Sequence, residues 1–141
     1  MLRRNAAGGA MALAATAILT LTFKEWSAMI RPIDGSTVSG TATAMPHAGD
    51  SLVVNIRIKG AVAGDANPWH VHTGGCDSSG AALGDPARYA PMTIKADQTG
   101  EATARVKTVL RVGVPYSVNV HRSQSDMGVI ACGNLRPIAG H

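Results

Sequence analysis

The 141-residue sequence has few aromatic residues, few charged residues and only two cysteines. Aromatic side chains make up 4% of the chain and charged ones 16%, and the net charge of +4 is not gathered into any dense run of Lys or Arg. Scattered basic residues do not form the electrostatic surface that nucleic acids require, so a nucleic-acid partner is excluded. A chain of this length has room for one domain, not two.

Small residues and Val dominate the apolar set, and glycine is frequent, with 16 residues. This composition favours short strands and many turns over a helical bundle. No long amphipathic helical pattern follows residue 35, and residues 73–91 have the composition of an irregular loop. Strands at close spacing predict an all-β sandwich or barrel, with residues 92–96 and 101–106 forming a hairpin. The expected strands are 36–44, 52–59, 69–72, 92–96, 101–106, 116–121 and 128–132.

The longest uncharged stretch covers residues 6–23 and follows Arg3 and Arg4. This arrangement is typical of a secretory signal peptide or of a single membrane anchor. We favour an anchor over residues 1–28, because cleavage after Ala28 would place Trp26 where a small residue is needed. The positive flank then keeps the N-terminus in the cytoplasm and places the rest of the chain on the periplasmic side of the inner membrane.

The remaining organisation follows from the anchor. Trp26 and Lys24 are expected at the membrane interface, in contact with lipid. Residues 29–35 are expected to be a linker, and residues 36–141 a single β domain. In an exported protein, Cys76 and Cys132 are expected to form a disulfide, whereas in a cytoplasmic protein they would be two buried thiols.

Two short motifs place histidines on strands. Alternate residues of a strand face the same side, so His70 and His72 share one face, opposite Trp69 and Val71. In the strand 116–121 the same rule places His121 on the polar face. If the two strands are neighbours, three imidazoles converge on one metal ion, and neutral imidazole suits copper, zinc, iron or nickel. The alternative is three histidines that form only hydrogen bonds.

The order of these motifs resembles the copper/zinc superoxide dismutase family from residue 36 onward. The specific parts are the HVH of residues 70–72, the strand that ends at His121 and the ACG of residues 131–133. The resemblance implies a Greek-key β-barrel with copper on its outer face, bound by His70, His72 and His121. It also implies a disulfide between Cys76 and Cys132.

The chain departs from the family's pattern at several positions. The histidine that bridges copper to zinc has no counterpart, and the loop at 74–90 contains no histidine. The long charged loop is reduced to residues 122–131, and residues 128–130 contain no arginine where the family has its active-site arginine. Efficient dismutation is therefore not expected. A fourth ligand would come from water, Met127, Asp126 or His47, and zinc competes with copper for three imidazoles.

Three functions remain open from the sequence. The first is a membrane-anchored, periplasmic copper-binding domain for copper handling or weak redox defence. The second is a non-catalytic accessory subunit of a larger membrane complex of electron transfer, respiration or photosynthesis, possible because fold does not fix function. The third is a simplified copper-only superoxide dismutase.

Overall fold

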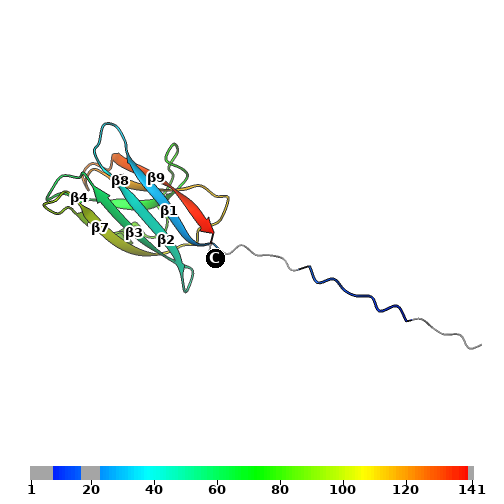
Figure 1. Cartoon of the computed structure of the whole chain (residues 1–141). Helices are drawn as coiled ribbons and strands as arrows, with labels where there is room; N and C mark the ends of the chain where they lie inside the picture. Colours follow the sequence, from blue (N-terminus) through cyan, green and yellow to red (C-terminus); the bar gives the residue numbers. More distant parts are fainter. Residues whose placement is uncertain (1–7, 17–22, 140–141) are drawn as a thin grey trace, which may run out of the picture.

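The computed structural model describes residues 8–16 and 23–139. Over these residues the chain folds into one β domain, and residues 8–16 form neither helix nor strand (Figure 1). Within the described part of the chain, no helix is both long and apolar enough to cross a membrane. Much of the expected anchor, residues 1–7 and 17–22, lies outside the described residues.

Nine strands and one short 3₁₀-helix make up the described domain. They are β1 (Phe23–Pro32), β2 (Ser39–His47), β3 (Ser51–Lys59), β4 (Ala66–Asn67), β5 (Trp69–Thr73), η1 (Pro86–Arg88), β6 (Met92–Thr93), β7 (Gly100–Lys107), β8 (Tyr116–His121) and β9 (Val129–Ala139).

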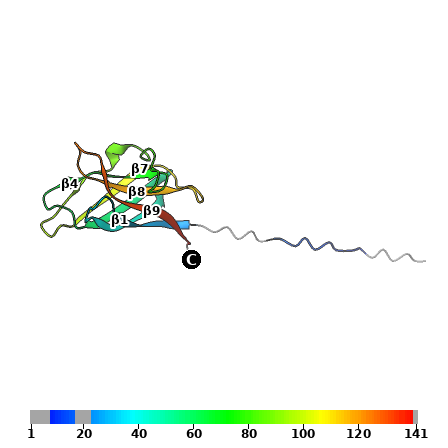
Figure 2. The same ribbon diagram turned by 90° about the horizontal axis from the view of Figure 1, so that it is seen from above.

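Seven of the strands form one antiparallel sheet in the order β5-β8-β9-β1-β2-β3-β7, and β4 pairs with β6. The long sheet curls, so that its two ends face each other across the core (Figure 2). Alternate residues of β3, from Leu52 to Ile58, point into this core, as do Trp69 and Val71 of β5. The all-β fold class predicted from the composition is confirmed.

The hairpin between β2 and β3 shows how local sequence sets register. His47 pairs with Ser51, so only three residues form the loop. Gly49 and Asp50 both adopt positive φ, the left-handed conformation that glycine and aspartate tolerate better than most residues. The turn therefore starts β3 in the register that sends Leu52 inward.

The expected linker is a strand. β1 lies in the middle of the sheet, between β9 and β2, with Trp26 opposite Ala44 and Pro137. Trp26 is only 3% exposed and packs edge-on against Tyr116, so its expected place at a membrane interface is wrong. In the sequence, the apolar stretch that ends at Phe23 makes it hard to recognise where the alternation of buried and exposed residues in β1 begins. The β domain thus begins at residue 23 instead of 36, and cleavage after Ala28 would divide its central strand.

The expected hairpin of residues 92–106 forms only as a turn. Lys95 N–H donates to the Thr99 carbonyl at 2.9 Å, which closes the turn. Beyond it, β6 pairs with β4 through Met92 and Asn67, and β7 pairs with β3. The two segments therefore belong to different sheets. The last strand is also longer than expected, because β9 continues to Ala139 along β1.

Candidate metal centre

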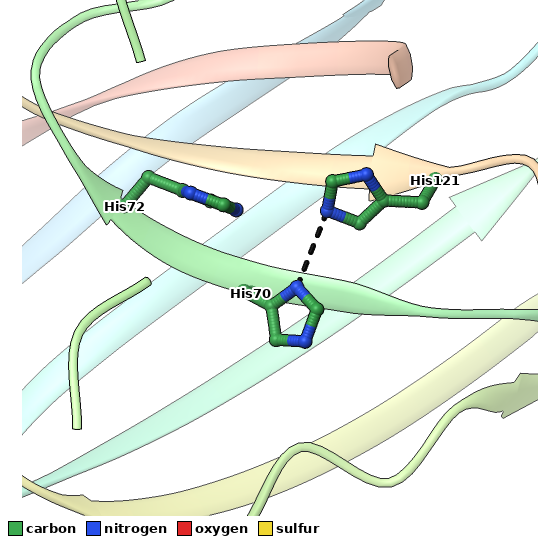
Figure 3. Close-up of side chains that lie close together, drawn as sticks. All are labelled: His70, His72 and His121. Atoms are coloured by element: carbon green, nitrogen blue, oxygen red, sulfur yellow. Dashed lines mark hydrogen bonds between the residues drawn. The ribbon is translucent and has the colours of Figure 1, made fainter. Parts of the chain in front are cut away.

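Strands β5 and β8 hold the three histidines at one end of the curled sheet. The strands are antiparallel neighbours, with His70 opposite Asn119 and His72 opposite Ser117. His121 is the last residue of β8, where the pairing with β9 shifts by one residue. The extra residue, Ile130, belongs to β9, so the bulge bends β9 beside the end of β8. Figure 3 shows the three rings turned toward a common point.

The ring geometry fits a single small ion. The ring centroids lie 5.6 Å apart for His70 and His72, 5.2 Å for His70 and His121, and 5.6 Å for His72 and His121. One nitrogen from each ring lies within 4.8 Å of the others. His70 Nδ1 is 3.2 Å from His121 Nε2. Two lone pairs at this distance repel, so the pair needs a shared proton or a cation.

Backbone carbonyls fix two of the three tautomers. His72 Nδ1–H donates to the Gly80 carbonyl at 2.9 Å, and His121 Nδ1–H donates to the Met127 carbonyl at 2.8 Å. Each ring is therefore left with a lone pair on Nε2, as in histidine ligands whose other nitrogen is held by a second partner. The His72 Nε2 atom is buried and has no hydrogen-bond partner among the described residues. A metal ion would satisfy it.

Burial keeps His70 and His121 in the neutral form that binds metal. His70 is 9% exposed, and this burial, with the neighbouring charges of His121 and His72, lowers its pKa to about 4. Burial also lowers the pKa of His121, although the hydrogen bond to the Met127 carbonyl acts in the opposite direction. Because metal competes with protons for the same nitrogen, lowered pKa values favour metal binding near neutral pH.

Asn67 holds the end of β8 and was not identified from the sequence. Its Nδ2 donates to the carbonyls of His121 and Arg122 at 3.0 and 3.2 Å, and His121 N–H donates to the Pro68 carbonyl at 2.8 Å. Asn67 is 3% exposed. A buried carboxamide that binds two carbonyls fixes the backbone from which the His121 ring projects. These contacts join residues more than 50 positions apart, so no local pattern indicates them.

Tyr89 forms an aromatic wall beside His70 and was also missed. Its ring lies edge-on to the rings of Trp69 and His70, with centroids 5.1 and 5.2 Å away. Its hydroxyl donates to the Leu83 carbonyl at 2.8 Å, and burial raises the pKa of Tyr89 to about 12. The Tyr89 side chain therefore stays protonated and shields one side of His70 from water.

The comparisons with known proteins rest on the fold. No family model matches the sequence, and no curated protein matches it. Among solved structures, a point mutant of superoxide dismutase 5 from Candida albicans aligns with 86% of this chain and 95% of its own, with a TM-score of 0.58 and 16% identity. This chain has the superoxide dismutase fold. The resemblance inferred from the HVH and ACG motifs is confirmed at that level.

On this superoxide dismutase fold, the cysteines meet as expected. Cys76 and Cys132 form a disulfide that links the loop 74–91 to β9. Cys76 N–H also donates to Asn134 Oδ1 at 2.9 Å. The loop that carries the Gly80 carbonyl is thereby tied to the sheet, and with it the partner of His72.

Two of the residues expected as a possible fourth metal ligand lie away from the three histidines. His47 Nε2 is 3.3 Å from the Arg105 guanidinium at the other end of the sheet. Asp126 pairs with Arg122 at 3.2 Å and accepts a hydrogen bond from Gly128 N–H. Met127 lines the pocket of about 650 Å³ that contains the three histidines, together with Tyr89 and Gln124. Met127 and water remain as candidates for the fourth ligand.

The histidine pocket has no guanidinium or ammonium group among the described residues that line it. Arg122 follows His121 but lines a different pocket, with Asp34 and Val62. Arg88 lies in η1 and does not line the histidine pocket, although its neighbours Pro86 and Ala87 do.

Proposed function

We propose that this protein is a membrane-anchored, periplasmic domain that binds one copper ion through His70, His72 and His121 and is not an efficient dismutase. The observation that carries the proposal is the buried, unpartnered His72 Nε2 atom beside two other imidazoles. Leaving a buried acceptor without a partner costs free energy, and a bound cation removes that cost.

The donor set fits copper better than the other divalent metals. Three imidazoles without a carboxylate or thiolate suit copper and zinc, and nitrogen ligands bind Cu(II) more tightly than Zn(II). Met127 would add a thioether, which favours Cu(I) over Zn(II). Copper bound here would supply one-electron redox chemistry. The chain's own contribution is to hold two tautomers through the carbonyls of Gly80 and Met127 and to exclude water with Tyr89.

We expect weak dismutation because of the charges and the proton donors that the pocket residues lack. Attraction of an anionic substrate requires positive charge near the metal, and the described lining residues include no Lys or Arg. No fourth imidazole joins the group to relay a proton. Dismutation is the second candidate function, and the fold shared with a superoxide dismutase favours it.

The cellular location is part of the proposal. The uncharged stretch 6–23 behind Arg3 and Arg4 supports a single-pass anchor in the inner membrane. The Cys76–Cys132 disulfide supports an oxidising compartment such as the periplasm. If no metal binds, the accessory-subunit function becomes the better explanation for an intact fold with an unused centre.

Metal content after native membrane extraction tests the copper site. Elemental analysis of the wild type is expected to give close to one copper per chain, and His70→Ala/His72→Ala is expected to lose it. His47→Ala is the matched control, because this histidine contacts Arg105 and not the centre. Zinc in place of copper would contradict the metal assignment, and no metal in any of the three proteins would overturn the site itself.

A further inference from the structure

One end of the domain presents exposed valines. β7 ends beside the start of β3, with Lys107 opposite Ser51, and residues 108–114 follow as a loop that we call the valine loop. Its side chains Val109, Val112 and Val114 are 52%, 56% and 42% exposed. These three valines lie within six residues of one another and add apolar surface to this end of the domain.

The valine loop lies beside the start of β1. Gly113 and Val114 line one hollow with Trp26 and Pro137, and Phe23 pairs with Ala139 at the same end of the sheet. Figure 1 shows β1 entering the domain at this end. The uncharged stretch 6–23 therefore runs directly into the strand, without the linker that the sequence predicted.

Charges around the loop favour an anionic surface. Lys107 precedes the valines, Arg111 lies between Val109 and Val112, and Arg136 lines the same hollow as Val114. The acidic residues at this end are Glu25 on β1 and Asp50 in the hairpin loop beside Val109. Cations close to an anionic leaflet are attracted to it. Apolar side chains beside cations match the boundary between headgroups and acyl chains.

We propose that the valine loop inserts into the outer leaflet of the membrane and holds the domain upright on the bilayer. The inference rests on the membrane anchor of the proposed function, since the anchor brings this end of the domain to the lipid. The partner is a lipid bilayer with anionic headgroups.

The orientation sets how far the histidine ligands lie from the lipid. His121 ends β8, five residues beyond Tyr116 and about 16 Å further from the valine loop at 3.3 Å per residue. His72 lies opposite Ser117, one residue beyond Tyr116, so it is the ligand nearest the membrane end of the domain.

Depth measurements on the full chain in nanodiscs of phosphatidylglycerol and phosphatidylcholine test the inference. The described cysteines are joined in the disulfide, so one added cysteine can carry an environment-sensitive fluorophore. Val112→Cys reports the valine loop. Val62→Cys is the matched control, because Val62 is 64% exposed and follows β3 at the opposite end of the sheet. Leu13→Cys reports the anchor.

The fluorophore at position 112 is expected to be quenched several-fold more by spin-labelled lipid than by aqueous iodide, and the fluorophore at position 62 to show the reverse. Equal iodide quenching at 112 and 62, with a lipid-quenched fluorophore at 13, would overturn the valine-loop inference and leave the anchor intact. Iodide quenching at 13 would overturn the anchor, and lipid quenching at 112 in that case would still support the loop.

Discussion

His72 and His121 each use one ring nitrogen on a main-chain carbonyl, so loop backbone decides which nitrogen faces the centre. The carbonyl for His72 belongs to Gly80, where a Cβ would lie 2.5 Å from Thr73 Oγ1. A side chain at position 80 would therefore require either Thr73 or the loop to shift. The glycine leaves room for the loop to bring its carbonyl to a histidine eight positions away.

The lowered pKa of His70 predicts acid-sensitive stability in the metal-free protein. Its pKa is about 4 in the folded state and near 6.5 when unfolded, so at intermediate pH only the unfolded chain gains this proton. The stabilisation is complete above pH 6.5 and is lost as pH falls toward 4. Between pH 7 and pH 5 the free energy of unfolding should fall by about 2 kcal/mol, as measured by urea unfolding of the chelator-treated protein.

Substitution of His70 separates its contribution to the pH dependence of stability from the contributions of other titrating groups. His70→Gln has no proton to gain in this range and should lose about 2 kcal/mol less than the wild type between the two pH values. His47→Gln changes an exposed histidine and should keep the full pH dependence. An identical pH dependence in the wild type and His70→Gln would show that His70 is not held neutral by the fold.

At the scale of single residues, the sequence predicted the side-chain directions that depend only on strand alternation. His70, His72 and His121 lie on the outer side of β5 and β8 because Trp69, Val71 and their counterparts on β8 fill the core. Asn67 and Tyr89 could not be predicted, because their roles depend on contacts across the fold. The same reason explains why the expected fourth ligand His47 lies at the other end of the sheet.

Among the elements, the loop between β5 and β6 matters most for the centre. It has little regular structure beyond η1, yet it carries the Gly80 carbonyl and the Tyr89 ring. The disulfide from Cys76 fastens it to β9. A long irregular segment can thus hold a metal ligand in place, because covalent and hydrogen bonds replace the missing strand pairing.

Removal of the disulfide should weaken both stability and copper binding. Closing a loop across a separation of 56 residues contributes about 4 kcal/mol by the chain-entropy relation. Cys76→Ser/Cys132→Ser should lower the free energy of unfolding by roughly 2–4 kcal/mol. Because the partner of His72 becomes mobile, copper affinity should fall by about 10- to 100-fold, as measured by competition with a chelator.

Ser79→Ala is the matched control for the disulfide, because it alters the same loop and leaves the bond intact. Ser79 Oγ donates to the Gly75 carbonyl and contacts Ser117 Oγ. Its loss should cost about 1 kcal/mol and barely change copper affinity. Equal copper affinity in all three proteins would show that the loop does not position His72.

Strands were predictable where one face alternates cleanly with the other. β3 meets this condition, and its core residues Leu52, Val54 and Ile56 were recognised from the two-residue period. β1 was not recognised, because Trp26, Ala28 and Ile30 are separated by only two residues from an apolar stretch that is typical of an anchor or signal peptide. The pairing of β6 with β4 was missed because a turn signal shows where a chain reverses but not which strand it joins.

On the scale of the whole molecule, the histidine pocket differs from the rest of the surface in its lack of positively charged side chains. Positive residues are spread over the domain, yet none lines the histidine pocket among the residues that the structure describes. Long-range attraction of an anion to this pocket is therefore weak. The fold shared with a superoxide dismutase does not by itself bring the steering that fast dismutation requires.

Superoxide decay followed at several ionic strengths tests this interpretation. The copper-loaded protein should react slowly, with a rate that hardly changes with salt. Gln124→Arg places a cation at the pocket and should raise the low-salt rate about tenfold, and the gain should disappear as salt screens the charge. A wild-type rate that falls steeply with salt would contradict the proposal that this protein is not an efficient dismutase.

If the chain is exported as we propose, the central position of β1 also determines when the domain can fold. β1 would emerge first from the translocation channel, but one of its two neighbours, β9, is made last, with Phe23 pairing to Ala139. Strands that are far apart in the sequence pair late and slowly during folding. In that case one side of β1 would stay unpaired until synthesis of the chain is nearly complete. Such an intermediate would need protection from aggregation by chaperones or by the nearby membrane.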